Sequence, residues 1–106
     1  MVHKISRYTF YSDAWHGWLK VSLKDLKELG LIDDITQYSY IKGDYAYLEE
    51  DHDANLFIKA YEKKTSKKVK GSDFKESIQS SGRSPIRYFR PYTPESAKKT
   101  LRRKEI

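Results

Sequence analysis

The 106-residue sequence contains no cysteine and no long apolar run. The missing cysteine excludes disulfides, thiolate catalysis and the common structural zinc sites. No segment approaches the ~20 apolar residues that span a bilayer, and residues 1–7 do not open into the apolar stretch of a secretory signal peptide. We therefore expect a soluble protein of the reducing cytoplasm, with no membrane partner.

Aliphatic residues are also scarce. Leu, Ile, Val and Phe make up 23 of the 106 residues, a share just above the composition at which chains stay unfolded. Nine tyrosines and two tryptophans are present, so tyrosine rings must supply part of the core. The length suits one small domain, which we place at residues 1–92, followed by a basic C-terminal helix or tail at residues 93–106.

Charge is divided unevenly along the chain. Residues 1–58 contain six Lys or Arg and ten Asp or Glu, whereas residues 59–106 contain fifteen and five. The net charge of +6 thus combines an acidic first half with a strongly basic second half. This asymmetry points to a basic surface for phosphates or for an acidic protein, although lysine-rich segments also serve solubility alone.

Three helices are expected from periodicity and capping signals. Ser22 is typical of an N-cap, with Asp25 at the third helical position and Gly30 after the last turn. Thr93 is a second such N-cap, because proline occupies the first helical position after it. The expected helices are residues 23–29, a segment from about residue 51 or 53 to 64, and residues 94–104.

Four or five short strands complete the predicted fold. Alternating aromatic and β-branched residues predict strands at 7–11 and 18–21, followed by a hairpin around Lys42-Gly43. Residues 69–78 predict a weaker strand, and residues 83–92 are expected to be extended because two prolines interrupt any regular helix. We therefore predict an α+β fold, a small antiparallel sheet of four or five strands with two helices on one face and a basic C-terminal segment.

The register of the hairpin is open at this stage. A two-residue turn at Lys42-Gly43 pairs Tyr40 with Tyr45 and Tyr38 with Tyr47, which places all four rings on one face. A three-residue loop instead divides the rings between both faces. Rings that share one face either stack nucleic-acid bases or fill the core.

The segment from residue 83 to residue 92 is the strongest candidate for binding. Its arginines alternate with aromatic rings, and arginine forks bind phosphate or carboxylate while rings stack on bases. The alternative is an edge strand whose arginines lie along its surface. The candidate residues for binding a partner or nucleic acid, including those of the basic helix that follows, are Arg83, Arg87, Tyr88, Arg90, Tyr92, Lys98, Lys99, Arg102 and Arg103.

Two further clusters favour structural roles. Residues 49–53 combine four acids with His52, but their spacing matches no metal motif, and acids at a helix start cap its free N–H groups. Trp15 and Trp18 flank His16 without an identifiable catalytic partner, so the indoles are expected to anchor the core or a partner surface. We predict no catalytic residue, no metal and no cofactor. The candidate aromatic anchors are Trp15, Trp18, Tyr38, Tyr40, Tyr45 and Tyr47.

Four short motifs follow one another along the chain: HGWLKV at 16–21, YSY at 38–40, GDYAYLEED at 43–51 and SPIR at 84–87. Over residues 7–92 the chain resembles a group of small phage, plasmid and bacterial proteins with no established activity. The resemblance implies a bacterial host cytoplasm and a non-enzymatic protein that binds and modulates, often inhibits, a host protein or nucleoprotein. By analogy, an antiviral defence effector such as CRISPR–Cas is the expected partner.

The residues alone favour a competing function, direct binding of RNA or DNA by the basic, aromatic-rich second half. The two expectations differ in their response to salt. Phosphate binding weakens steeply with salt because counterions are released. An interface anchored by buried aromatic rings loses mainly association rate.

Overall fold

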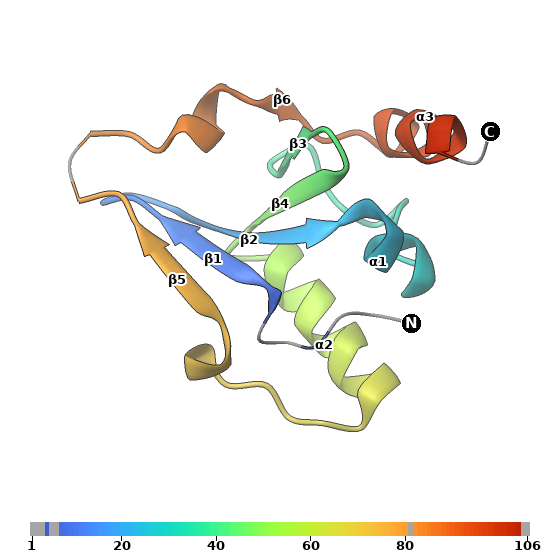
Figure 1. The fold of residues 1–106 in the computed structure, drawn as a ribbon, viewed down its shortest axis with the longest axis horizontal. Helices are drawn as coiled ribbons and strands as arrows, with labels where there is room; N and C mark the ends of the chain where they lie inside the picture. The colour runs from blue at the N-terminus through green and yellow to red at the C-terminus, as the bar shows by residue number, and fades with distance from the viewer. Residues whose placement is uncertain (1–3, 5–6, 81, 105–106) are drawn as a thin grey trace.

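The fold is described by a computed structural model that covers residues 4, 7–80 and 82–104. The described residues form an α+β structure in which a six-stranded mixed sheet carries three α-helices (Figure 1). The strands are β1 (Thr9–Ser12), β2 (Gly17–Ser22), β3 (Tyr40–Lys42), β4 (Tyr45–Glu49), β5 (Lys75–Ile78) and β6 (Arg90–Pro91). The helices are α1 (Leu23–Glu28), α2 (Asp53–Thr65) and α3 (Pro94–Lys104), with short 3-10 helices η2 (Gly71–Asp73) and η3 (Pro85–Tyr88).

The α+β class is confirmed, but the sheet is not the expected antiparallel one. The strand order is β5-β1-β2-β4-β3-β6, and β5 runs parallel to β1, pairing Thr9 with Lys75. Helix α2 and the segment after it return the chain to the edge beside β1, so β5 enters in the same direction as β1 (Figure 1). The predicted four or five strands are roughly compatible with the six observed. The expected antiparallel pairing is wrong for β1 and β5, because pairing between strands so far apart in the sequence leaves no local signal.

The predicted helices are confirmed, and their starts follow local capping. The Ser22 hydroxyl accepts a hydrogen bond from the Asp25 N–H at 3.1 Å, and the Thr93 hydroxyl accepts one from the Ser96 N–H at 3.1 Å. Each bond satisfies a backbone donor that the first helical turn leaves without an internal partner. Ser66 ends α2 in the left-handed region, with φ of 59°.

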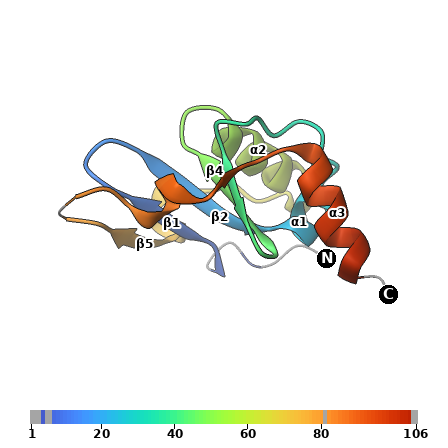
Figure 2. The same cartoon turned by 90° about the horizontal axis from the view of Figure 1, so that it is seen from above.

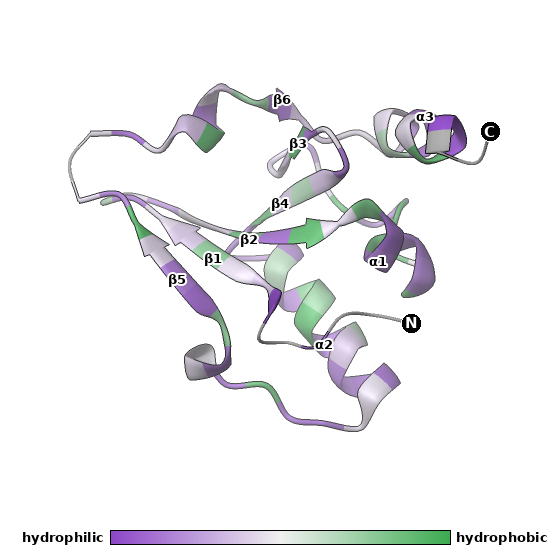
Figure 3. Cartoon of the chain, viewed as in Figure 1, coloured by the Kyte–Doolittle hydropathy of each residue, from purple (hydrophilic) through white to green (hydrophobic). Residues whose placement is uncertain are grey.

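The main core lies between helices α1 and α2 and one face of the sheet. The register places Phe10, Leu19 and Leu48 in one row across β1, β2 and β4. Figure 2 shows α2 on one side of the sheet, and in Figure 3 its apolar colours lie in the turns next to the strands. The core also holds buried tyrosines, as the composition predicts; they are Tyr8, Tyr61 and Tyr92.

The opposite face of the sheet carries a second, smaller core. Trp18 and Tyr47 point to this face, and Ile86 of η3 packs on them. Phe89 completes the cover, with its ring 5.0 Å from that of Tyr47 in an edge-to-face contact. Residues 84–89 therefore form a lid over the Trp18 part of this face. The predicted extended conformation of residues 83–92 is wrong for Pro85–Tyr88, which form η3, and correct for Arg90–Pro91, which form β6. Pro85 occupies the first position of η3, where a helix needs no N–H.

The hairpin adopts neither of the two registers considered from the sequence. Tyr40 pairs with Tyr47 and Lys42 with Tyr45, so the turn consists of Gly43 and Asp44. Gly43 has φ of +58°, the left-handed backbone that glycine adopts at the first central position of a type II′ turn. This geometry requires glycine rather than lysine at that position, which moves the turn by one residue and the partner of Tyr40 by two, from Tyr45 to Tyr47.

Three sequence expectations fall partly outside the described residues. The expectation against a secretion signal rests on residues 1–7, of which 1–3 and 5–6 are not described. Ser81, between the predicted strand at 69–78 and the segment that begins at residue 83, is not described either. Residues 105–106 of the basic C-terminal segment also lie outside. Within the described part of the chain, no helix combines the length and apolar character needed to cross a membrane.

Candidate nucleic-acid interface

Asp13 holds the lid segment on the sheet. Its buried carboxylate accepts hydrogen bonds from the Ser84 N–H at 3.0 Å and from Arg87 Nε at 2.7 Å and Nη2 at 3.1 Å. The same carboxylate also caps the β1–β2 turn by accepting from the N–H groups of Trp15 and His16. The hydrogen bond from the Arg87 guanidinium holds the pKa of Asp13 far below its ordinary range.

Arg87 consequently has a structural role rather than the predicted docking role. Its side chain is 19% exposed, and its guanidinium lies 5.7 Å from the Trp15 ring and 5.6 Å from the Trp18 ring. The hydrogen bond to Asp13 raises the pKa of Arg87, so the group stays charged and paired. Its Nε and Nη2 donors are therefore used for Asp13 rather than for a phosphate.

Three of the predicted aromatic contacts are also internal. Tyr92 is fully buried, and its hydroxyl donates to the Ile32 carbonyl oxygen at 2.6 Å, while burial raises its pKa. Trp18 and Tyr47 belong to the small core under η3. The prediction that Tyr92 contacts a partner is therefore wrong, because the ring fills the core that the few aliphatic residues leave open. Trp18 and Tyr47 anchor the core rather than a partner surface.

The remaining predicted residues stay accessible. Tyr40 is half-buried, Tyr45 is 42% exposed and Tyr38 is 75% exposed. Tyr38 precedes β3, so the four tyrosines do not form one face. Lys98 forms an ion pair with Asp33 at 2.8 Å. The other exposed residues among the predicted set are Trp15, Arg83, Tyr88, Arg90, Lys99, Arg102 and Arg103.

A groove of about 680 Å³ brings part of this set together. Its walls are the β3–β4 turn, the end of η3 with β6, and the face of α3 that carries Ser96, Thr100 and Arg103 at helical spacing. Arg90 and Tyr88 line it opposite α3. Arg83 and Arg87 do not line it, so only one of the three alternating arginines of residues 83–92 faces the groove.

Lys42 is the groove residue that the sequence analysis missed. The hairpin signal predicts Lys42 in the turn, but Lys42 is the last residue of β3. Its Nζ lies 4.6 Å from the Phe89 ring centroid. This cation–π contact holds the ammonium at the groove wall. Together with Arg90 and Arg103 it gives the groove three cations, against the single carboxylate of Asp44. The groove is thus suited to an anion with phosphate or carboxylate groups.

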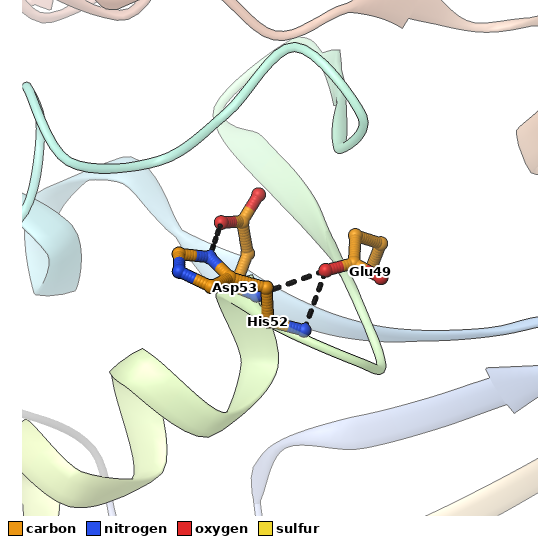
Figure 4. Close-up of side chains that lie close together, drawn as sticks. All are labelled: Glu49, His52 and Asp53. Carbon is orange, nitrogen blue, oxygen red and sulfur yellow. Dashed lines mark hydrogen bonds and ion pairs between the residues drawn. The ribbon is translucent and has the colours of Figure 1, made fainter.

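Glu49, His52 and Asp53 form a cluster at the start of α2, which the Glu49 carboxylate caps. Their ligand-type atoms lie within 4.8 Å of one another (Figure 4). Glu49 Oε1 accepts from the N–H groups of His52 and Asp53, and Asp53 Oδ2 accepts from Thr36 and Ser39. Since all the carboxylate oxygens already accept hydrogen bonds within the fold, the geometry favours the capping interpretation over a metal site.

The His52–Asp53 pair makes stability depend on pH. The hydrogen bond to Asp53 raises the pKa of His52. Burial raises the pKa of Asp53, but hydrogen bonds from Ser39, His52 and Thr36 outweigh it and lower the pKa overall. Stabilisation by His52 is complete below its ordinary pKa of 6.5 and is lost as pH rises through the raised value. Stabilisation by Asp53 is complete above 3.8 and is lost as pH falls through the lowered value.

We expect the thermal midpoint of unfolding to fall between pH 6 and pH 8 in the unaltered chain, and to fall less in His52→Gln. The difference should not exceed a few degrees, because His52 is exposed and solvent screens the pair. Thermal unfolding followed by circular dichroism at both pH values measures it. Identical shifts in the two chains would show that His52 does not contribute.

The groove combines arginine forks, a lysine ammonium and an exposed tyrosine ring, the set of groups that proteins use to bind phosphate backbones and stack bases. Its three walls come from segments that are far apart in the sequence and are joined by the sheet and by the docking of α3 (Figure 2). In comparisons with protein-family models, curated proteins and solved structures, no match to this chain is found.

Proposed function

We propose that this chain is a non-enzymatic nucleic-acid-binding protein that uses the groove between the β3–β4 turn, β6 and α3. The observation that carries the proposal is the convergence of Lys42, Arg90 and Arg103 around one hollow beside Tyr88. Tyr88 is 76% exposed, so its ring is accessible to a base beside these cations. Phosphates would meet the cations, and the net charge of +6 favours encounter with a polyanion.

Two observations support a binding role over catalysis. Among the described residues, the acids and imidazole of Glu49, His52 and Asp53 lie close together, but Glu49 caps the start of α2 and Asp53 binds Ser39 and His52. Asp13 is buried and paired with Arg87. These carboxylates therefore have structural contacts that account for their positions.

The triple variant Lys42→Gln, Arg90→Gln, Arg103→Gln tests the proposal. We expect its affinity for a fluorescent oligonucleotide to fall at least tenfold at physiological salt. The slope of log affinity against log salt should fall by about 2, because each lost phosphate contact removes ~0.7 for a single strand. Fluorescence anisotropy at several salt concentrations measures both quantities.

The matched control removes the same charge elsewhere. Lys63, Lys64 and Lys68 are exposed at and after the end of α2, away from the groove. Lys63→Gln, Lys64→Gln, Lys68→Gln should retain most of the affinity and of the salt slope. Equal losses in both triple variants would point to diffuse charge attraction and contradict a defined groove.

A second candidate function is modulation of a host protein, such as a defence effector. One surface favours it: Trp15 is 61% exposed and Tyr38 is 75% exposed near a hollow of about 420 Å³. Tyr38 lines that hollow together with Glu49, Glu50 and Asp51, which gives it an acidic rim suited to a basic protein surface. The absence of nucleic-acid binding in the experiment above would favour this function instead.

A further inference from the structure

The groove continues around the β3–β4 turn. A hollow of about 290 Å³ shares Asp44 and Thr100 with the groove, and a third of about 230 Å³ shares Ser22 and Tyr45 with the second. Because each neighbour shares two lining residues with the next, the three hollows form one path. We call this path the basic track; it runs from Arg7 past Tyr45 to Tyr88.

Cations line the whole track. The second hollow adds Lys24, and the third adds Arg7 and Lys20, to the three cations of the groove. Among the described residues that line the track, Asp44 is the acid, so six positive charges face one negative charge. A string of cations along a path, rather than one cluster, matches the repeating charge of a nucleic-acid backbone.

The sheet register explains why these residues meet. Lys20 of β2 pairs with Tyr47, and Ser22 with Tyr45, so these side chains lie on the sheet face opposite the main core. Lys20 Nζ lies 4.2 Å from the Tyr45 ring centroid. The lid of residues 84–89 covers the Trp18 half of this face. The half with Lys20 and Tyr45 lines the open track.

Two exposed rings stand on the track. Tyr45 is 42% exposed at the junction of the second and third hollows, and Tyr88 is 76% exposed in the groove. In a duplex the base faces are stacked inside and meet no side-chain ring, whereas a single strand can turn its bases onto aromatic side chains. Aromatic rings between cations therefore increase affinity for a single strand, by stacking on its bases, and do not increase affinity for a duplex.

From these observations we propose that the basic track binds single-stranded nucleic acid, with phosphates along the cations and bases against Tyr45 and Tyr88. This inference rests on the proposed function and adds the kind of nucleic acid and the path it follows. The proposal includes no sequence preference, because an aromatic ring stacks on every base.

Three probes of equal length test the inference: a fluorescent oligothymidylate, an abasic strand with the same phosphates, and a duplex. A length of about 12 nucleotides lies within the ~4–16 that small single-strand-binding domains cover. We expect the oligothymidylate to bind at least tenfold more tightly than the abasic strand. Tyr45→Ala and Tyr88→Ala should each lower oligothymidylate affinity by about tenfold. Neither variant should change affinity for the abasic strand.

The controls separate stacking from folding. Tyr38→Ala removes an equally exposed ring off the track and should leave all affinities unchanged. Tyr45→Phe and Tyr88→Phe keep the ring and should bind like the unaltered chain. Equal binding of duplex and oligothymidylate, unaffected by either alanine variant, would overturn the inference and leave the proposed function intact. Failure to bind any of the three probes would overturn both.

Discussion

Asp13→Ala is expected to release residues 84–90 from the sheet while the rest of the fold persists. The change removes the shared acceptor of the Ser84 N–H and the Arg87 guanidinium, and it leaves a partly buried arginine without its carboxylate. An unpaired charge that is largely shielded from water is unfavourable, so the arginine should move to solvent and take η3 with it. Hydrogen exchange followed by mass spectrometry should show residues 84–90 as unprotected as exposed loops.

The same release should weaken nucleic-acid binding, because Tyr88 and Arg90 line the groove only while η3 is docked. Asp33→Ala is the matched control, since it removes an acid from the exposed ion pair with Lys98. Exposed pairs contribute about 0–1 kcal/mol, so this variant should exchange and bind like the unaltered chain. Unchanged protection of residues 84–90 in Asp13→Ala would show that packing on Trp18 alone holds the lid.

Phe57→Ala is expected to lower the free energy of unfolding by about 3–5 kcal/mol. Phe57 is fully buried between α2 and the sheet, where its ring meets Tyr8 edge-on at 5.2 Å and stacks near Tyr61 at 6.2 Å. The loss is a large part of the ~5–15 kcal/mol that stabilises a small domain. Urea unfolding followed by circular dichroism gives the difference.

Lys59→Ala is the control on the same helix, because Lys59 is exposed. It should change the free energy of unfolding by no more than about 0.5 kcal/mol. A loss below about 1 kcal/mol in Phe57→Ala would mean that the core does not rest on this ring. A similar loss in both variants would contradict a packing effect specific to Phe57, because alanine has the highest helix propensity and does not weaken the helix at either position.

Local signals were enough for much of the fold. Ser22 and Thr93 predict the starts of α1 and α3 because capping involves residues within one turn. The scarcity of aliphatic residues correctly predicts tyrosine in the core. The position of the hairpin is predicted correctly, but its register is not. The register depends on the turn position of Gly43, which is the first central residue of the turn and not the second, as both predicted registers require.

Long-range contacts left no such signal. Asp13 and Arg87 are 74 positions apart, and nothing near either residue identifies the other as its partner. Because of this ion pair, Arg87 holds the fold together, whereas the sequence predicts that it contacts a partner. The ion pair also places a short 3-10 helix where the prolines predicted extended chain. Tyr92, the last residue of the same segment, is buried for a related reason, since its hydroxyl reaches the Ile32 carbonyl across the core.

Composition, periodicity and capping are local properties, and they predict the α+β class, the helix starts, the basic second half and the dependence of the core on tyrosine. Which charges share a surface depends instead on the tertiary structure. Lys20 and Lys42 come from the acidic first half, yet they line the same track as Arg90 and Arg103. Strand register and the docking of α3 bring them together, and both depend on contacts between residues far apart in the chain.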